Sequence, residues 1–388
     1  MVSKSENNVL TIRLPERIDS ASAGETEAKL LEILAENPAE KLVLDAQDMQ
    51  YISSAGLRVV LRLKKEYRSL EIINASTDVY DIFEMTGFTE MMTITKAYRR
   101  MSVEGCEVIG KGAKGTVYRY NADTIVKVYN SADCLPDILN ERELARKAFV
   151  LGIPTALSFD VVLVGDKFGA VFELLDAKSY SQLIAENPGN LEKYVREFAE
   201  LLKKIHGTAV KTADMPSAKQ MPERWLANAE KIFPAGLSAR LRALAETIPE
   251  QATMVHGDYH TNNILMQNGE TLLIDMDTLS YGHPVIELAN IYITYVGFGM
   301  ISPGVVENFL GFGYETACDF WRLFLKIYLG TADEKRLEET EKKIKILSLL
   351  RLANHVYKRS DEASKQRAIG LCTEELTRLT EEVESLEF

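Results

Sequence analysis

The segment Met254 to Leu265, MVHGDYHTNNIL, contains Asp258 and Asn263 five positions apart between apolar runs. A short loop between strands can direct a carboxylate and an amide at one reaction centre: the carboxylate accepts a proton from a substrate hydroxyl, and the amide oxygen binds Mg²⁺. The segment LLIDMD follows, an apolar strand that ends in Asp275 with Asp277 after it. A carboxylate at the end of a buried strand is costly unless it binds a cation or has another partner. Asp258, Asn263 and Asp275 therefore suit a hard divalent metal that also contacts phosphates.

A glycine-rich segment, IGKGAKGTVYRY, lies upstream, and Gly110, Gly112 and Gly115 have the spacing G-x-G-x-x-G. A strand follows the last glycine, whereas a Rossmann dinucleotide site needs a helix there. A glycine-rich hairpin can instead cover nucleotide phosphates, because glycine has no Cβ and lets backbone amides approach closely. Lys127, in TIVKVY, is a lone cation within an apolar strand. Its expected anionic partners are the α- and β-phosphates and Glu141 of the next helix.

Over roughly residues 105–330 the chain resembles the aminoglycoside phosphotransferase and choline kinase branch of the protein-kinase-like fold. The matching features, in chain order, are the glycine loop, Lys127, Glu141 with Gly152-Ile153-Pro154 after it, Leu202 and His206, HGDYHTNN, and LLIDMD. The resemblance implies an α+β bilobal fold with ATP and Mg²⁺ bound between the lobes. It also implies transfer of the γ-phosphoryl group to an acceptor hydroxyl.

The resemblance assigns roles by motif position. Asp258 would be the catalytic base, with Asn263 and Asp275 as magnesium ligands. Lys127, paired with Glu141, would hold the ATP phosphates under the glycine loop. His256 would brace the catalytic loop. Glu173-Leu174-Leu175 would form the linker between the lobes, and the backbone of this linker would meet adenine.

Four positions depart from the family pattern or compete with it. Glu287, in PVIELA, occupies a position where the family often has Asp, and we expect the same bracing role from its longer side chain. Asp277 is an extra acid, either a solvated carboxylate or a ligand of a second metal. Glu143 competes with Glu141 for the lysine, and the spacing to the Gly-Ile-Pro turn favours Glu141. His260 is interpreted as a structural hydrogen-bond partner rather than a catalyst.

A second turn whose residues could take part in chemistry lies in Leu44 to Lys65, where an apolar strand leads through SSAG into a helix. Serine hydroxyls before a helix cap free amides, and the same place favours a phosphoserine because a helix N-terminus stabilises an anion. Residues 8–100 resemble the STAS family of anti-sigma-factor antagonists, in which a partner kinase phosphorylates a serine of this turn and switches binding to an anti-sigma factor. Motif position favours Ser54 over Ser53, whereas Ala55 replaces a serine that many members carry. Capping alone and phosphorylation both stay open.

The elements that position these residues change character along the chain. Strands are expected at 9–14, 41–45, 70–73 and 91–94, and helices at 21–35, 54–67 and 79–86. This alternation predicts an α/β STAS domain over residues 1–102, a mixed or parallel sheet with helices.

The rest, residues 103–388, begins with strands and continues with helices, which predicts the two lobes of the kinase domain. Strands are expected at 108–120, 124–129, 161–164 and 169–174, a helix at 137–151, and mainly helices beyond 181 except around 254–277. The N-lobe would span about 103–178 and the C-lobe about 179–388. Helices within 180–250 and 285–350 would form the acceptor pocket. Their aromatic residues are either core or pocket lining: Trp225, Tyr295, Phe298 and Trp321.

Composition is that of an ordinary folded protein, with 46% hydrophobic and 26% charged residues among 388, which excludes a mostly disordered or collagen-like chain. The net charge of −12 disfavours general nucleic-acid binding. Residues 1–105 carry 13 Lys+Arg against 17 Asp+Glu, so their partner is expected to be a protein rather than DNA. The four cysteines have no metal-ligand spacing and are expected to be reduced thiols of a cytoplasmic protein. No signal peptide or membrane passage is expected.

The first hypothesis is therefore a phosphotransferase that uses ATP and Mg²⁺, acts on a small hydroxyl compound and has a regulatory STAS domain. The alternative is a partner-switching anti-sigma-factor antagonist whose kinase-like domain senses nucleotide or phosphorylates a STAS serine. A kinase-shaped protein without activity is the remaining possibility. The acidity of the chain suits a cationic acceptor, such as an amino sugar or choline, although total charge does not locate a pocket.

Overall fold

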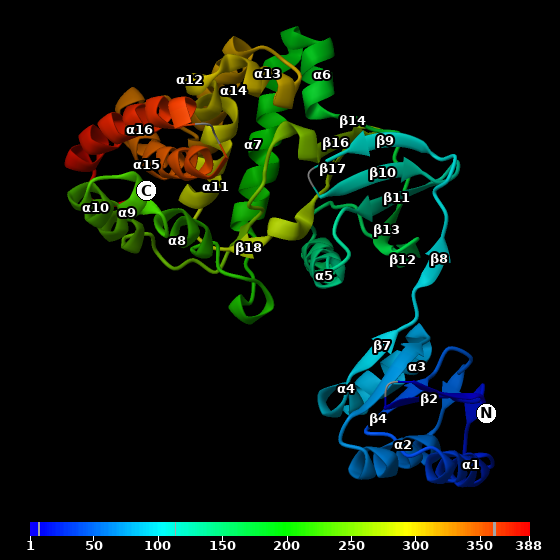
Figure 1. Cartoon of the computed structure of the whole chain (residues 1–388). Coiled ribbons are helices and arrows are strands. Elements are labelled where there is room, and N and C mark those ends of the chain that lie inside the picture. The colour runs from blue at the N-terminus through cyan, green and yellow to red at the C-terminus, as the bar shows by residue number, and fades with distance from the viewer. Residues whose placement is uncertain (7, 113, 360–361) are drawn as a thin grey trace. The chain divides into compact units, whose positions relative to one another are not determined.

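The computed structural model describes residues 1–6, 8–112, 114–359 and 362–388 (Figure 1). The chain forms two units, one of Met1–Glu104 with Val161–Lys167 and the other of Gly105–Asp160 with Phe168–Phe388. Within the described ranges no helix is both long and apolar enough to cross a bilayer.

The first unit contains a five-stranded sheet in the order β1-β2-β4-β6-β7. Its strands are β1 (Ser3–Glu6), β2 (Val9–Arg13), β4 (Lys41–Asp45), β6 (Leu70–Ala75) and β7 (Ile94–Lys96). Its helices are α1 (Ala23–Glu36), α2 (Ser54–Glu66), α3 (Thr77–Met85) and α4 (Phe88–Met91). Strand β1 is antiparallel to β2, whereas β2, β4, β6 and β7 are parallel, because a helix connects each to the next. The mixed α/β sheet is as predicted.

Two details of this unit differ from the prediction. The fourth expected strand, at 91–94, begins only at Ile94, because Met91 ends α4. Strand β1 was not predicted, since SKSE is too polar to show strand periodicity. Two short parallel pairs complete the unit. They are β3 (Arg17–Ile18) with β5 (Tyr51–Ile52), and β8 (Arg99–Met101) with β12 (Asp160–Val164).

The second unit begins with antiparallel strands in the order β13-β11-β10-β9. They are β9 (Glu107–Lys111), β10 (Gly115–Arg119), β11 (Thr124–Tyr129) and β13 (Lys167–Glu173). The expectation of one strand over 108–120 is wrong, because Gly112 N–H donates to Gly115 O over 2.9 Å in a turn that separates β9 from β10. Helix α5 (Leu135–Val150) follows β11 and buries Leu144 and Ala148.

Helices dominate the rest of the second unit, as predicted (Figure 1). They are α6 (Tyr180–Glu186), α7 (Leu191–Gly207), α8 (Gln220–Leu226), α9 (Ala229–Ile232), α10 (Ala235–Glu246), α11 (Val285–Tyr292), α12 (Phe298–Ile301), α13 (Pro303–Leu310), α14 (Tyr314–Leu329), α15 (Glu334–Arg359) and α16 (Glu362–Glu382). Phe198 of α7 lies at the centre of their core, with edge-to-face contacts to Phe320 at 5.0 Å and Phe324 at 5.3 Å. Trp321 and Tyr295 are buried in the same core, so these two aromatics do not line a pocket.

Short strands within the helical part flank the segments that contain Asp258, Asn263 and Asp275. These strands are β14 (Lys178–Ser179), β15 (Met254–Val255), β16 (Ile264–Gln267), β17 (Glu270–Leu273) and β18 (Ser280–Tyr281). Strands β16 and β17 form a hairpin with Ile264 opposite Leu273. The prediction that β17 runs to Asp275 is wrong: the strand ends at Leu273, and Asp275 has φ 63° and ψ 64°, outside the extended region.

Candidate functional site

The loop between β15 and β16 carries Asp258, and its backbone requires a glycine directly before the aspartate. Gly257 has φ +88°, and a Cβ there would lie 2.6 Å from Thr278 O. On the other side of Asp258, the buried Tyr259 hydroxyl donates to Phe198 O over 2.8 Å. Asp258 is therefore placed between a position that only glycine fits and a tyrosine anchored in the helical core.

Glu287, in the first turn of α11, accepts hydrogen bonds from the backbone that precedes Asp258. Its carboxylate receives the N–H of His256 over 2.6 Å and the N–H of Gly257 over 2.9 and 3.0 Å. The side chain is fully buried. Burial acts to raise the pKa of Glu287, but His206, whose Nε2 lies 3.9 Å from Oε2, and the charge of His256, with the Gly257 N–H, lower it overall. Glu287 is thus an anion that satisfies two buried donors.

Asp258 itself reaches the surface, with 42% of its side chain exposed. Its Oδ2 lies 3.5 Å from His260 Nε2, and its N–H donates to His256 Nδ1 over 3.3 Å. Burial acts to raise the pKa of Asp258, but the hydrogen bond and charge of His260, with the charges of His256 and Arg351, lower it to about 2. The carboxylate is therefore ionised at neutral pH and available as a proton acceptor.

Asn263 and Asp275 are connected to the same loop through the backbone. Asn263 Nδ2 donates to Asp258 O over 3.0 Å, which leaves its Oδ1 as the acceptor that a cation could use. Ile274 N–H donates to Asn263 O over 3.0 Å, and Asp275 is the residue directly after Ile274. A left-handed conformation is uncommon for aspartate, and such conformations cluster at functional sites.

Lys127 of β11 joins the sheet of the second unit to α5 and to the loop after β17. Its Nζ lies 3.2 Å from Glu141 Oε1 and 3.3 Å from Asp275 Oδ1. The hydroxyl of Tyr129 donates to Glu141 Oε2 over 2.9 Å. Burial acts to lower the pKa of Lys127, but the charges of Glu141 and Asp275 raise it overall, so the ammonium is retained. The structure therefore brings Lys127, Glu141 and Asp275 together.

The three glycines of the β9–β10 turn differ in what the fold requires of them. At Gly115 a Cβ would lie 2.4 Å from Val128 O, so the sheet itself requires glycine. At Gly110 the nearest atom to an added Cβ is at 3.7 Å, and at Gly112 it is at 3.9 Å, both ordinary contacts. Packing within the protein therefore does not explain Gly110 and Gly112.

A third carboxylate lies beside Glu141 and Asp275. Carboxylate oxygens of Glu141, Asp275 and Asp277 lie within 4.8 Å of one another, a donor set that suits a hard cation. Asp277 also forms an ion pair with Lys114 of the β9–β10 turn. Of the two residues expected to hold Mg²⁺, Asp275 belongs to this set and Asn263 offers an amide oxygen, so their donor types fit such a cation.

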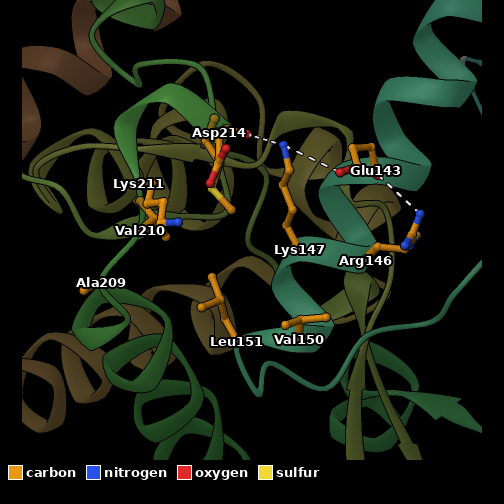
Figure 2. A pocket seen from close by; sticks show the side chains of 10 residues that line it. Glu143, Arg146, Lys147, Val150, Leu151, Ala209, Val210, Lys211 and Asp214 are labelled. Carbon is orange, nitrogen blue, oxygen red and sulfur yellow. Dashed lines mark hydrogen bonds and ion pairs between the residues drawn. The ribbon is translucent and has the colours of Figure 1, made fainter. Parts of the chain in front are cut away.

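Glu143 lies in a different environment from Glu141. Its carboxylate pairs with Arg146 and Lys147 at 3.6 and 3.7 Å, and Lys147 Nζ donates to Asp214 O over 2.8 Å (Figure 2). These residues line a pocket of about 550 Å³ between α5 and residues 209–215. Of the two candidate glutamates, it is Glu141 that pairs with the lysine.

The expected linker between the lobes follows β13. Glu173 is the last residue of that strand and is exposed, while Leu175 is half-buried. Between them, Leu174 N–H donates to Asp123 O over 2.8 Å. Residues 174–177 form neither helix nor strand.

In the first unit, the two serines before α2 have different environments. Ser53 is the N-cap, and its hydroxyl accepts from Ala55 N–H over 3.2 Å. Ser54 is the first residue of the helix and is exposed. Gly56 is required by packing, because a Cβ there would lie 2.8 Å from Ile18 O.

Sequence reasoning missed several residues that support the site. Tyr129 could have been found, because it lies two positions after Lys127 on the same strand face. Thr278, whose Oγ1 donates to His256 O over 2.8 Å, and Asn290, whose Nδ2 donates to Gly257 O over 2.9 Å, had no sequence signal. Arg351 had none either, because α15 is far along the chain from the loop.

The chain matches two protein-family models. Residues 105–324 match the model of the phosphotransferase enzyme family, and residues 1–101 match that of the STAS domain. BtrV of Bordetella bronchiseptica, whose name describes it as an anti-sigma factor antagonist, is 32% identical over 84 residues, which are 21% of this chain and 72% of that protein.

Solved structures resemble the larger part of the chain. A thermostable mutant of aminoglycoside phosphotransferase APH(4)-Ia, in a ternary complex with AMP-PNP and hygromycin B, has a TM-score of 0.50 at 15% identity and covers 70% of this chain and 93% of its own. Aminoglycoside phosphotransferase APH(2'')-Ib, bound to ADP, has a TM-score of 0.47 at 16% identity and covers 77% and 98%. At such identity the first likeness shows the kinase-like fold.

Proposed function

The chain belongs to the phosphotransferase enzyme family and carries a STAS domain at its N-terminus, and from this we propose that it transfers the γ-phosphoryl group of ATP to a hydroxyl of a small molecule. The observation that carries the proposal is the convergence on one place of an ionised Asp258, the amide of Asn263, and the Lys127–Glu141–Asp275 cluster. Residues 103–388 would be catalytic, with an N-lobe to about 178. Residues 1–102 would be regulatory.

In this proposal Asp258 is the catalytic base. Its carboxylate accepts the acceptor's proton as the hydroxyl oxygen bonds to the γ-phosphorus and the bond to ADP breaks. His256 and Glu287 are positioning residues, since they hold the backbone of the turn before Asp258.

Nucleotide would be held by the turn between β9 and β10 and by Lys127. Gly110 and Gly112 fit this role, because their lack of a side chain is not required by the protein's own packing. Gly115 shapes the turn, and Glu141 orients the lysine. The backbone of Glu173 and Leu175 would meet adenine.

Asn263 and Asp275 would hold Mg²⁺, with Asp277 as a third oxygen donor nearby. When bound, the cation would neutralise charge on the transferring phosphoryl group. The donor atoms are carboxylate and amide oxygens, the ligands that magnesium prefers.

The proposal is tested by comparing the wild-type chain with Asp258→Asn. We expect calorimetry to show similar binding of ATP with Mg²⁺ in both, and ADP formation with a panel of hydroxyl acceptors to be lost in the variant. Asp319→Asn, at an exposed position on α14, is the matched control. Absence of ATP binding in the wild-type chain, or full activity in Asp258→Asn, would contradict the proposal.

A second candidate function rests on Ser54, which is exposed at the first position of α2, where a phosphate would meet a helix N-terminus. The chain would then act as a partner-switching anti-sigma-factor antagonist, and its kinase-like domain would sense nucleotide or phosphorylate this serine. Labelled ATP followed by peptide mapping tests the phosphorylation. Capture of an anti-sigma factor that is lost in Ser54→Asp tests the switch, and label absent from both Ser53 and Ser54 rejects the kinase variant. The cytoplasmic location expected from the cysteines stays a prediction.

A further inference from the structure

Arg351 of α15 is a cation whose charge reaches the catalytic loop although it lies outside the family match. Its Nη1 donates to Asn290 Oδ1 over 2.6 Å, and Asn290 Nδ2 donates to Gly257 O over 2.9 Å. Gly257 directly precedes Asp258, so two hydrogen bonds connect the guanidinium to the backbone of the loop. The guanidinium also lies over the Trp225 ring of α8, with Cζ 5.9 Å from the ring centroid.

Arg351 belongs to a polar face of α15, which we define as Arg351, Asn354 and His355. Positions three and four apart lie together on a helix surface. Asn354 Oδ1 accepts from Asn228 Nδ2 over 2.9 Å, and the His355 ring contacts that of Phe298 edge-to-face at 5.1 Å. Helix α15 packs against α8, α9 and α11, so a polar face here lies inside the helical lobe rather than on its outer surface.

The two carboxylates whose charges act on this cation, Asp258 and Glu287, are already engaged by other groups. Glu287 receives two backbone N–H groups, and Asp258 lies beside His260. Among the described residues Arg351 forms no ion pair within 4.0 Å, and one of its five N–H groups, on Nη1, donates to an acceptor, Asn290 Oδ1. A half-buried guanidinium without a carboxylate partner is costly, and its planar fork fits a carboxylate or phosphate in bidentate geometry.

We propose that Arg351 binds an anionic group of the acceptor, a carboxylate or a phosphate ester, so that the substrate is a hydroxylated acid. The inference rests on the proposed phosphotransferase function and names its acceptor class. The acceptor's hydroxyl oxygen bonds to the γ-phosphorus, ADP leaves, and the hydroxyl proton passes to Asp258, while Arg351 holds the anionic end. The expectation of a cationic acceptor, drawn from the acidity of the whole chain, is replaced by one drawn from the charge beside the loop.

The test compares matched acceptors with the full chain, ATP and Mg²⁺. D-Glycerate and glycerol 3-phosphate are the anionic members, glycerol is the neutral one, and choline and glucosamine are cationic. We expect kcat/KM to be at least tenfold higher for an anionic member, and the preferred one distinguishes carboxylate from phosphate. Arg351→Gln should lower kcat/KM for that member about 10- to 100-fold, about 1.4–2.8 kcal/mol, through KM rather than kcat. Arg351→Lys should recover part of the loss.

Arg224→Gln, at an exposed position of α8, is the control and should leave the preference unchanged. Equal or better turnover of glycerol, choline or glucosamine would overturn the inference. An equal loss for every acceptor in Arg351→Gln would do so too, because it would mark Arg351 as merely structural.

Ligand-observed NMR with D-glycerate and glycerol 3-phosphate separates this inference from the proposed function. If the chain binds no ATP, the proposed function fails, and weaker binding of these probes by Arg351→Gln still supports an anion site. If neither probe binds to the wild-type chain, the anion site is refuted even where ATP is bound. Should Arg351→Gln fail to fold, the kcat/KM values of the wild-type chain for the anionic, neutral and cationic acceptors still test the inference.

Discussion

Replacement of Glu287 by glutamine tests the central structural argument, that a buried anion holds the turn before Asp258. The carboxylate accepts from His256 N–H over 2.6 Å and from Gly257 N–H over 2.9 Å, and its side chain is fully buried. Hydrogen bonds to a charged acceptor contribute about 1.5–3 kcal/mol each, and neutral ones about half as much. Glutamine keeps one acceptor oxygen and directs an amide toward donors. We therefore expect the free energy of unfolding to fall by about 2–4 kcal/mol.

The effect on activity follows from the same contacts. Gly257 directly precedes Asp258, so loss of the group that accepts the Gly257 N–H is expected to displace the Asp258 carboxylate relative to the acceptor hydroxyl. A displacement of about 1 Å can cost 10²-fold in rate. We expect kcat for ADP formation to fall at least tenfold in Glu287→Gln, whereas the dissociation constant for ATP changes less than threefold, because Lys127 and the glycine turn are untouched.

Urea unfolding followed by circular dichroism measures the stability, and coupled ADP detection measures kcat. Glu246→Gln, at an exposed position of α10, makes the same chemical change away from the site and should alter stability by less than about 0.5 kcal/mol. If Glu287→Gln matches the wild type in both measurements, the carboxylate does not hold the turn and the reasoning is refuted. If stability falls while kcat per folded molecule is unchanged, Glu287 is structural but does not position Asp258.

The other predictions concern glycines, caps and pH. Gly115→Ala should lower the urea midpoint strongly because its Cβ meets backbone, whereas Gly110→Ala should fold normally and weaken ATP binding in calorimetry; equal midpoints would contradict the packing argument. Ser53→Ala should destabilise the chain by about 1 kcal/mol through the lost cap, and Ser54→Ala by much less, as thermal unfolding would show. Burial, with the charges of His206 and Lys343, lowers the pKa of the His283 imidazole to about 4, so the unfolded state binds more protons below pH 6.5. The free energy of unfolding should therefore fall by about 2 kcal/mol from this residue as pH decreases from 7.5 to 5. A His283→Gln variant should lose this dependence of stability on pH. If the variant shows the same dependence as the wild type, the prediction is contradicted.

Much of the fold could be predicted because its signals are local. The helix at 54–66 has serines at its start and apolar residues at helical spacing, and the strands at 41–45 and 124–129 are short apolar runs between turn residues. The strand expected through Asp275 was wrong because periodicity does not report φ, and a left-handed aspartate ends a strand without a glycine or proline to mark it. The strand at Ser3–Glu6 was missed because pairing with a neighbour, rather than its own residues, stabilises it.

The residues of the candidate site also fall into two groups, those with a local signal in the sequence and those without one. Asp258, Asn263 and Lys127 lie in short motifs with fixed spacing, so their types and order were enough to select them. Asn290 and Arg351 act through contacts between segments that are distant in sequence, and a single sequence contains no record of those contacts. The choice of Glu141 over Glu143 depended on spacing to a later turn. The structure gives the physical reason for this choice, since Glu141 pairs with Lys127 whereas Glu143 pairs with Lys147 within α5.

The charges of the site explain why net acidity is a poor guide to the acceptor. Three carboxylates within 4.8 Å of one another, Glu141, Asp275 and Asp277, repel each other, and at an effective dielectric constant of 20 two unit charges 4 Å apart cost about 4 kcal/mol. Lys127 and Lys114 offset this repulsion by pairing with them. A divalent cation shared by these acids would supply the same compensation and leave both lysines available to phosphate oxygens, which is the exchange that ATP with Mg²⁺ provides. In the proposed function the acids of this cluster would therefore serve the nucleotide, and Arg351 is the charge that we propose selects the acceptor.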